Sequence, residues 1–365
     1  MTLTNSASTP PFRMAVANAK RFARKMRDRW NRLVLRKVAT SPLAAGIYYG
    51  FFNREMMRES MAVAAGQIQY IREREEGPAS YFLLRRNIHR LEKALIMRPL
   101  RPSFASDYIE ETVNVFARAV QQAEKPWSRE LCWFADVLAR YFSIVDASPR
   151  QIAAALRRYR QIPLPPAAGE AEAAALVPYP RDLTGPPPVE YEQMMALARR
   201  RRSVRWYADQ PVPRDMIDRA LLVAAQAPSA CNRQPFVFRI FDDKEMVAKV
   251  SEIPMGTRGF SQQFPAVAVV VGQLRAYPFE RDRHVIYIDA SLAAMSFVFA
   301  LESMGLASCV INWPDQEPHE SRMKKALSLD DDERVVMLIA FGWPDRDGLV
   351  PYSAKRELTA MRSYN

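Results

Sequence analysis

The sequence of 365 residues is poor in the two side chain types that most often build disulfide frameworks and transition-metal sites. The cysteines are odd in number, far apart and without a CxxC pair: Cys132, Cys231 and Cys309. The histidines have no second His or Cys at ligand spacing: His89, His284 and His319. These absences argue against a disulfide scaffold and a metal centre, and they favour a reducing compartment.

The sequence also lacks an apolar segment that reads as a membrane span. The stretch SPLAAGIYYGFF, residues 41–52, is apolar but shorter than the about 20 residues that a spanning helix needs. A secretory signal is not indicated either, because Lys37 interrupts the approach to this stretch and no small-x-small cleavage site follows Phe52. We therefore expect a cytoplasmic protein.

Positive charge is abundant: the formal net charge is +12 and the sequence pI is about 9.7. Such a balance calls for an anionic partner, which can be nucleic acid, an anionic membrane or a phosphate-bearing ligand. Much of the charge lies in two places, residues 13–37 and the run RRRRSVR at 199–205. No nucleic-acid-binding module accompanies it, so the sequence does not favour a nucleic-acid partner.

Shifts in composition divide the chain into four parts. Residues 1–55 form a basic amphipathic segment, whose first ten residues we expect to be disordered, and residues 56–162 have the periodicity of a small helical domain. Residues 163–189 are rich in Pro and Ala and read as a linker. Residues 190–365 alternate between helical and strand-like stretches, which indicates an α+β domain.

The basic segment places Phe22, Met26, Trp30 and Leu33 on one face of a helix, with cations over much of the rest. One interpretation is an interfacial helix that lies on an anionic membrane, which would make the protein peripheral at the inner membrane face. The other is a helix whose apolar face packs on the helical domain. The sequence does not choose between them.

In the last part, strand-like stretches occupy residues 236–243, 266–274 and 334–344, and helical patterns occupy 189–200, 213–229 and 287–306. The helix at 287–306 is apolar on nearly every side. Such a helix must be buried all round, in a core or at a subunit interface.

Three polar clusters stand out in this part: RRSVR at 201–205, APSACNRQPF at 227–236 and SAKREL at 353–358. Each has an ordinary explanation by itself, as a helix C-terminus, a turn and a charged surface pair. Their order, the apolar helix ending in MGL and the strand ending in FGWP together resemble the FMN-dependent nitroreductase family. The resemblance covers a little under half of the chain and implies a nitroreductase-like mixed sheet flanked by helices, preceded here by a helical N-terminal domain.

The resemblance also implies a cofactor site. Arg201 and Lys355, with Arg356 near by, would hold the FMN phosphate. Arg202 and Ser203 would contact the ribityl chain, and Arg205 would lie at the pyrimidine edge and tune the flavin. A turn from the second subunit would pack against the same flavin through Pro228, Ser229 and Asn232. No side chain is expected to act as a catalytic acid or base, and Cys231 is expected to be a turn residue.

The implied activity is electron transfer from NAD(P)H to an electron-poor acceptor such as a nitroaromatic or a quinone. The family buries the helix at 289–304 in a homodimer interface, so we expect a homodimer. This chain departs from the family where a helical segment supplies an amide to the flavin edge. Gln262 or Gln263 could replace that amide, and backbone around Ile311 and Asn312 could replace a missing Glu-Gly pair.

An alternative function is a membrane-peripheral scaffold or regulator with a flavin-binding or vestigial nitroreductase domain. Its support is the long N-terminal half and the basic cluster Arg85, Arg86, His89, Arg90, Lys93, Arg98 and Arg101, which could face an anionic partner. We favour a solvated helix face for this cluster, with Ile88, Leu91 and Leu95 packed inward.

Overall fold

A computed structural model describes residues 11–75, 77–164 and 175–364, except for some side chains near the N-terminus. The chain divides into two compact units, residues 1–60 and 61–365, which are described separately. Residues 1–10 and 165–174, within the predicted N-terminal segment and linker, lie outside the described residues. The domain boundaries drawn from composition therefore stay a prediction.

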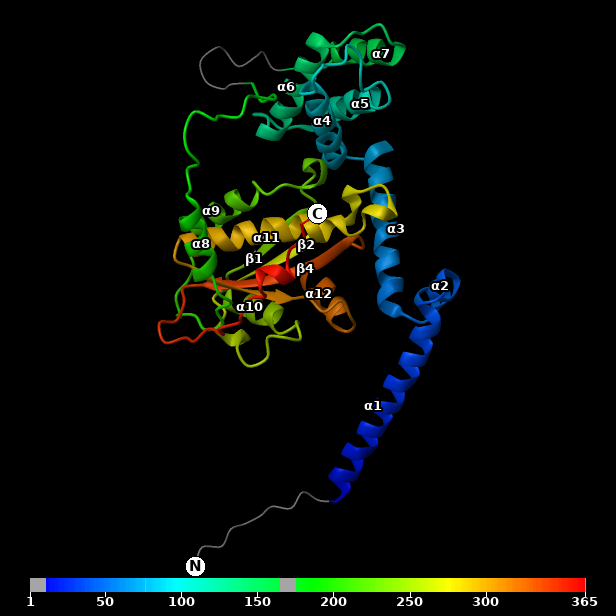
Figure 1. The fold of residues 1–365 in the computed structure, drawn as a ribbon. Coiled ribbons are helices and arrows are strands. Elements are labelled where there is room, and N and C mark those ends of the chain that lie inside the picture. Colours follow the sequence, from blue (N-terminus) through cyan, green and yellow to red (C-terminus); the bar gives the residue numbers. More distant parts are fainter. Residues whose placement is uncertain (1–10, 76, 165–174, 365) are drawn as a thin grey trace, which may run out of the picture. The chain divides into compact units, whose positions relative to one another are not determined.

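The first unit contains two helices and the start of a third: α1 (Pro11–Val38), α2 (Pro42–Phe51) and α3 (Arg54–Glu75), which continues into the second unit (Figure 1). The predicted basic helix is α1. The Ser41 hydroxyl accepts a hydrogen bond from the Ala44 amide at 3.4 Å and begins α2, which has no buried residue.

The helical part of the second unit is built from four helices: α4 (Tyr81–Leu95), α5 (Ile109–Gln122), α6 (Arg129–Ile144) and α7 (Arg150–Tyr159). Ser80 and Ser128 cap α4 and α6 by accepting hydrogen bonds from backbone amides three residues ahead. Phe116, Phe134 and Tyr141 lie among the fully buried side chains of one continuous core. The helices expected from periodicity are thus present, and their forming a separate domain stays a prediction.

The rest of the second unit contains a four-stranded sheet in the order β1-β2-β4-β3. The strands are β1 (Phe236–Phe241), β2 (Ala266–Gln273), β3 (Ala307–Asn312) and β4 (Glu333–Gly342). All three pairings of these strands are antiparallel, and a parallel bridge joins Ser203 to Ser308 at the β3 edge. The predicted α+β class is thus confirmed, with parallel pairing confined to that bridge within the described chain.

Helices cover both faces of this sheet (Figure 1). Along β2, Val267 and Val269 pack toward α10 (Lys244–Ser251) and α12 (His319–Leu327), whereas Ala268 and Val270 pack toward α9 (Arg214–Ala224) and α11 (Val285–Ser303). Successive side chains of a strand point to opposite faces. The uninterrupted apolar run of β2 follows because both of its faces are covered.

Helix α11 was expected to be buried on every side, and in the single chain it is not. Phe297, Val298 and Leu301 lie in the core against the sheet, while Ile288, Leu292 and Met295 are exposed. The segment Glu280–Ser303 is, within the described residues, the one helix long and apolar enough to cross a membrane by length and composition, and half of it is buried. Its contacts with the sheet are those of a core helix.

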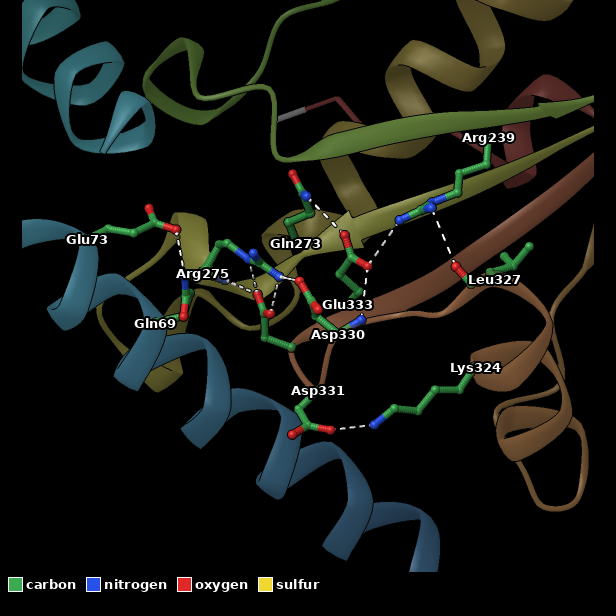
Figure 2. A network of polar contacts seen from close by, with 11 residues as sticks. Gln69, Glu73, Arg239, Gln273, Arg275, Lys324, Leu327, Asp330, Asp331 and Glu333 are labelled. Carbon is green, nitrogen blue, oxygen red and sulfur yellow. Dashed lines mark hydrogen bonds and ion pairs between the residues drawn. The ribbon is translucent and has the colours of Figure 1, made fainter. Parts of the chain in front are cut away.

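A polar network fixes the end of β2 (Figure 2). The Arg275 guanidinium contacts Asp330 Oδ2 at 2.6 Å and Asp332 Oδ1 at 2.5 Å. Close by, Gln273 Nε2 donates to Glu333 Oε1 at 3.1 Å. These contacts hold the short helix η3 (Leu274–Ala276), which directly precedes Tyr277.

Around the sheet, one strand and two α-helices were not expected from the sequence: β3, α10 and α12. Strand β3 has the sequence ASCVIN, too short and too small in its side chains to show a strand pattern. It forms because pairing with β4 satisfies its backbone groups. The arginine run lies beside β3.

Candidate functional site

The arginine run leaves the end of helix α8 (Tyr191–Arg200) and passes along the open edge of β3. The Val204 amide donates a hydrogen bond to the Ser308 carbonyl at 3.0 Å. Tyr207 is buried, and its hydroxyl shares its one proton between two carbonyls within hydrogen-bond distance, those of Val204 at 2.8 Å and Ala340 at 3.1 Å. The backbone of residues 203–207 is thereby tied to the sheet, which fixes where its side chains begin.

A cavity of about 340 Å³ opens beside this edge. Its walls are Arg205, Met255, Gly256, Phe260, Cys309, Val310, Ile311, Asn312 and Pro314. The Arg205 guanidinium carbon lies 5.6 Å from the centre of the Phe260 ring, and Arg205 Nη1 donates to the Ser203 carbonyl at 3.2 Å. The volume falls within the range of about 300–1,000 Å³ typical of small-molecule sites.

The cavity is positively charged. Burial raises the pKa of the Cys309 thiol, and the guanidinium groups of Arg205 and Arg201 oppose that rise. Arg201 and Arg202 are half-buried, and neither makes a hydrogen bond or ion pair with another side chain in the part of the chain that the structure describes. Arg200, in contrast, pairs with Glu302 at 2.9 Å. A half-buried cation without a protein partner is suited to an anionic ligand.

The second predicted segment is a tight turn between α9 and β1, in which Pro228 is exposed and Ser229 and Asn232 are half-buried. Three of its non-glycine residues have positive φ: Cys231 at 54°, Asn232 at 52° and Gln234 at 51°. That conformation costs free energy for residues other than glycine, so the surroundings must hold the turn in place. The Ser229 hydroxyl contributes by accepting a hydrogen bond from the Gln234 amide at 3.0 Å.

A buried carboxylate supports the turn from α11. Asp289 Oδ2 accepts hydrogen bonds from the Ala230 amide at 3.0 Å and from the Tyr277 hydroxyl at 2.9 Å. Burial raises the pKa of Asp289, while these donors and the nearby Arg233 cation lower it. The Arg233 guanidinium also lies over the Tyr277 ring at 4.7 Å. No local pattern in the sequence marks Asp289, because its partners Ala230 and Tyr277 lie 59 and 12 residues away.

The helical part of the chain reaches this turn as well. Arg85 Nη1, on α4, donates to the Asn232 carbonyl at 3.3 Å, and Arg85 Nε pairs with Glu130 Oε1 at 2.5 Å. An apolar cluster continues the contact, with Phe82 of α4 packing near Ala230 of the turn. Arg85 therefore joins a domain outside the predicted cofactor site to one of that site's segments.

A second member of the basic cluster on α4, Arg90, is engaged within the chain. Arg90 pairs with Asp107 at 3.1 Å and stacks on Tyr108 at 3.6 Å. Ile88 and Leu91 are fully buried, as expected for a helix face that packs inward. The contacts of Arg90 and the inward packing of Ile88 and Leu91 are those of a helix face, and the interpretation of the rest of the cluster stays a prediction.

The remaining predicted residues lie elsewhere. Lys355 and Arg356 are exposed on the C-terminal tail, where Arg356 Nη2 donates to the Ala360 carbonyl at 2.9 Å. Gln262 and Gln263 are exposed on a short helix next to Phe260. The structure brings Ile311 and Asn312 to the cavity with Arg205, but the contacts of its described residues do not join the tail or the Pro228–Asn232 turn to the arginine run.

Comparisons with known proteins identify a family for this part of the chain. The sequence model of the nitroreductase family matches residues 198–257 and 255–343. A protein of Archaeoglobus fulgidus named "Putative NADH dehydrogenase/NAD(P)H nitroreductase" is 30% identical over 161 residues, which cover 42% of this chain and 86% of that relative. Iodotyrosine deiodinase 1 of Rattus norvegicus is 24% identical over 195 residues, 46% of this chain and 67% of that protein.

Among solved structures, an FMN-dependent nitroreductase from Clostridium difficile is 23% identical with a TM-score of 0.41, and the match covers 47% of this chain and 99% of that one. The family match begins at the end of α8 and runs through the strand β4. It includes the arginine run, the Pro228–Asn232 turn and every strand of the sheet. Through this C-terminal half, the chain belongs to the nitroreductase family.

Proposed function

We propose that this protein is an FMN-dependent oxidoreductase that passes electrons from NAD(P)H to an electron-poor acceptor. The observation that carries the proposal is the gathering of Arg201 and Arg205 beside a cavity of small-molecule size on the β3 edge. Family membership gives the reaction type. The guanidinium groups of Arg201 and Arg202, which have no side-chain partner among the described residues, favour an anionic ligand, and the cavity wall beside Arg205 favours a planar, partly apolar body.

The residues present fit FMN. Arg201 and Arg202 are half-buried cations available to a phosphate and to ribityl hydroxyls, and Ser203 adds a hydroxyl beside them. The tail residues Lys355 and Arg356 are exposed and would complete the phosphate site. FMN, when bound, supplies hydride and electron transfer, so the chain needs no acid or base of its own.

Arg205 has a different role. Its contacts with the Phe260 ring and the Ser203 carbonyl hold the guanidinium at the cavity wall before any ligand arrives. A cation fixed in advance stabilises negative charge that develops next to it, because no reorganisation is required at that moment. Arg205 would therefore favour the reduced state of a bound ring system.

We further propose a homodimer in which Pro228, Ser229 and Asn232 come from the second copy. Its support is the exposed apolar stripe Ile288, Leu292 and Met295 on α11, at spacings of four and three residues. The substitution Leu292→Glu should convert a dimer into a monomer in sedimentation velocity. A monomeric native chain at micromolar concentration would contradict the dimer.

The flavin proposal is tested by absorbance spectroscopy of the purified protein, before and after reconstitution with excess FMN and gel filtration. We expect about one FMN per chain, bleached anaerobically by NADH or NADPH. The variant Arg199→Gln is the matched control, since Arg199 lies in the same run but outside the predicted motif. A reconstituted protein without flavin bands would contradict the proposal.

The acceptor is best identified with a panel on the flavin-loaded protein. Nitroaromatics and quinones test the proposed reductase activity. Iodinated phenols test a reaction like that of the iodotyrosine deiodinases, with which this chain shares 22–24% identity. The acceptor that reoxidises the reduced protein fastest under anaerobic conditions defines the substrate class. Bound flavin that neither nicotinamide reduces would instead favour the scaffold or regulator.

A further inference from the structure

The N-terminal unit carries an apolar stripe that its own helices do not cover. On α1, Phe22, Met26, Trp30 and Leu33 are exposed, Phe22 and Trp30 each to 68%. Their spacing of four, four and three residues places them on one face of the helix. A large aromatic side chain that remains two-thirds exposed gains little from folding, so this stripe needs another partner.

A basic stripe runs directly beside it. Arg21, Lys25, Arg29, Arg32 and Arg36 are exposed, and each precedes or closely follows a member of the apolar stripe in sequence. The two stripes share the same spacing and are offset by one residue, about 100° around the helix. The sequence of α1 contains one acidic residue, Asp28.

Helix α2 extends the apolar surface. Leu43 and Ile47 are exposed, Phe51 and Phe52 are exposed to 75% and 74%, and the helix has no buried residue. Its 10 residues span about 15 Å, half of the hydrocarbon thickness, so it can enter an interface but not cross it. Tyr48 and Tyr49 add the amphipathic rings that concentrate at membrane interfaces.

Charge identifies the partner. Residues 1–60 contain twelve Lys and Arg and three Asp and Glu, so they hold +9 of the chain's net +12. A second copy of α1 would bring two basic stripes together with one acidic residue on each helix to compensate them. Nucleic acid would neutralise the cations but leave Phe22 and Trp30 in water. An anionic bilayer surface satisfies both stripes.

We propose that α1 and α2 bind the surface of anionic lipid membranes, with α1 lying in the plane of the interface and the α2 aromatic residues inserted at the headgroup boundary. This inference does not depend on the flavin site. It makes the protein peripheral, held by the N-terminal unit while the family domain stays in the aqueous phase.

The test is co-sedimentation of the full-length protein with phosphatidylcholine vesicles, with and without phosphatidylserine. We expect binding to the anionic vesicles, weakening as salt rises, because the Debye length shortens to about 8 Å at physiological ionic strength. The triple variant Arg21→Gln, Lys25→Gln, Arg29→Gln should bind about a hundredfold more weakly, since each cation near an anionic surface contributes about fivefold.

Two further variants sharpen the result. Phe22→Ser with Trp30→Ser keeps the charge and should also release the protein, whereas Arg157→Gln with Arg158→Gln, exposed on α7, removes two cations elsewhere and should not. Equal binding to neutral vesicles, or equal binding by the α1 variants, overturns the proposal. A third outcome also overturns it. If the Phe22→Ser, Trp30→Ser variant sediments more slowly than the native protein in the absence of vesicles, the apolar stripe is a contact with a second copy of the chain.

Discussion

Residues 201–205 of the arginine run and the turn 228–232 are both predicted cofactor segments, yet they are built in opposite ways. The run keeps its backbone on the sheet and leaves the Arg201 and Arg202 guanidinium groups without protein partners among the described residues. In the turn, by contrast, polar groups form hydrogen bonds with one another and with Asp289 and Arg85. The first segment is therefore suited to supply ligand contacts, and the second to supply a fixed shape.

Removing the phosphate contacts should have the largest effect. Arg201→Gln with Lys355→Gln takes away two charge-assisted contacts worth about 1.5–3 kcal/mol each, so FMN should bind at least about a hundredfold more weakly. Fluorescence titration of the apoprotein with FMN measures this. Arg199→Gln should bind normally, and equal affinities of all three proteins would show that the run is not a ligand segment.

Substitutions at Asp289 test whether this buried carboxylate holds the turn 228–232 in its conformation. Asp289→Ala leaves the Ala230 amide and the Tyr277 hydroxyl without their acceptor in a buried place, and should lower the free energy of unfolding by about 2–3 kcal/mol. Urea denaturation followed by circular dichroism measures the loss. Asp289→Asn keeps an acceptor oxygen and should lose less. An equal loss in the two variants, which both remove the charge, would mean that the negative charge itself holds the turn.

Arg205 should affect rate more than affinity. Without its cation at the cavity wall, Arg205→Ala should slow anaerobic reduction of bound flavin by NADH or NADPH about ten- to a hundredfold. Stopped-flow absorbance at saturating nicotinamide measures the step. Arg258→Ala, an exposed arginine near the same cavity, is the control. A variant that reduces at the native rate but binds FMN weakly would assign Arg205 to binding alone.

Arg85 tests whether the helical domain steadies the turn. Arg85→Ala removes the hydrogen bond to the Asn232 carbonyl together with the Glu130 ion pair, and should cost at least about 1 kcal/mol of stability. Hydrogen exchange at residues 229–235 should rise in this variant and not in Arg86→Ala, its neighbour on α4. Exchange that rises along the whole of α4 instead would show a general loss of packing.

The smallest expected effect is on pH dependence. Because burial raises the pKa of Asp289, the folded state holds the proton more tightly than the unfolded chain does. Asp289 should therefore make the protein less stable as pH rises from the ordinary carboxyl range through the raised pKa. Asp289→Asn should flatten this part of the stability profile, and a parallel profile would mean that other groups dominate it.

Local pattern predicted much of the fold. The apolar periodicities of α4, α5 and α6 depend on residues a few positions apart, and the unbroken valine run of β2 identifies a strand covered on both faces. The order of the arginine run, the Pro-Ser turn and the Gly-Trp-Pro strand end indicated the nitroreductase family. Local pattern did not predict β3, a strand of six residues that forms because it pairs with β4.

The sequence by itself thus determined the class of the domain, the cationic character of its predicted ligand segment and the two stripes of α1, because each depends on residues that are close together in the chain. Tertiary structure alone decided that the arginine run lies along the edge of β3 and that Ile311 and Asn312 share a cavity with Arg205. It also decided that Asp289 and Arg85 hold the Pro-Ser turn. The contacts of Asp289 and Arg85 with the turn join residues 59 and 147 positions apart. Closing such long loops costs conformational entropy, so these contacts form only when the packing of the whole domain offsets that cost.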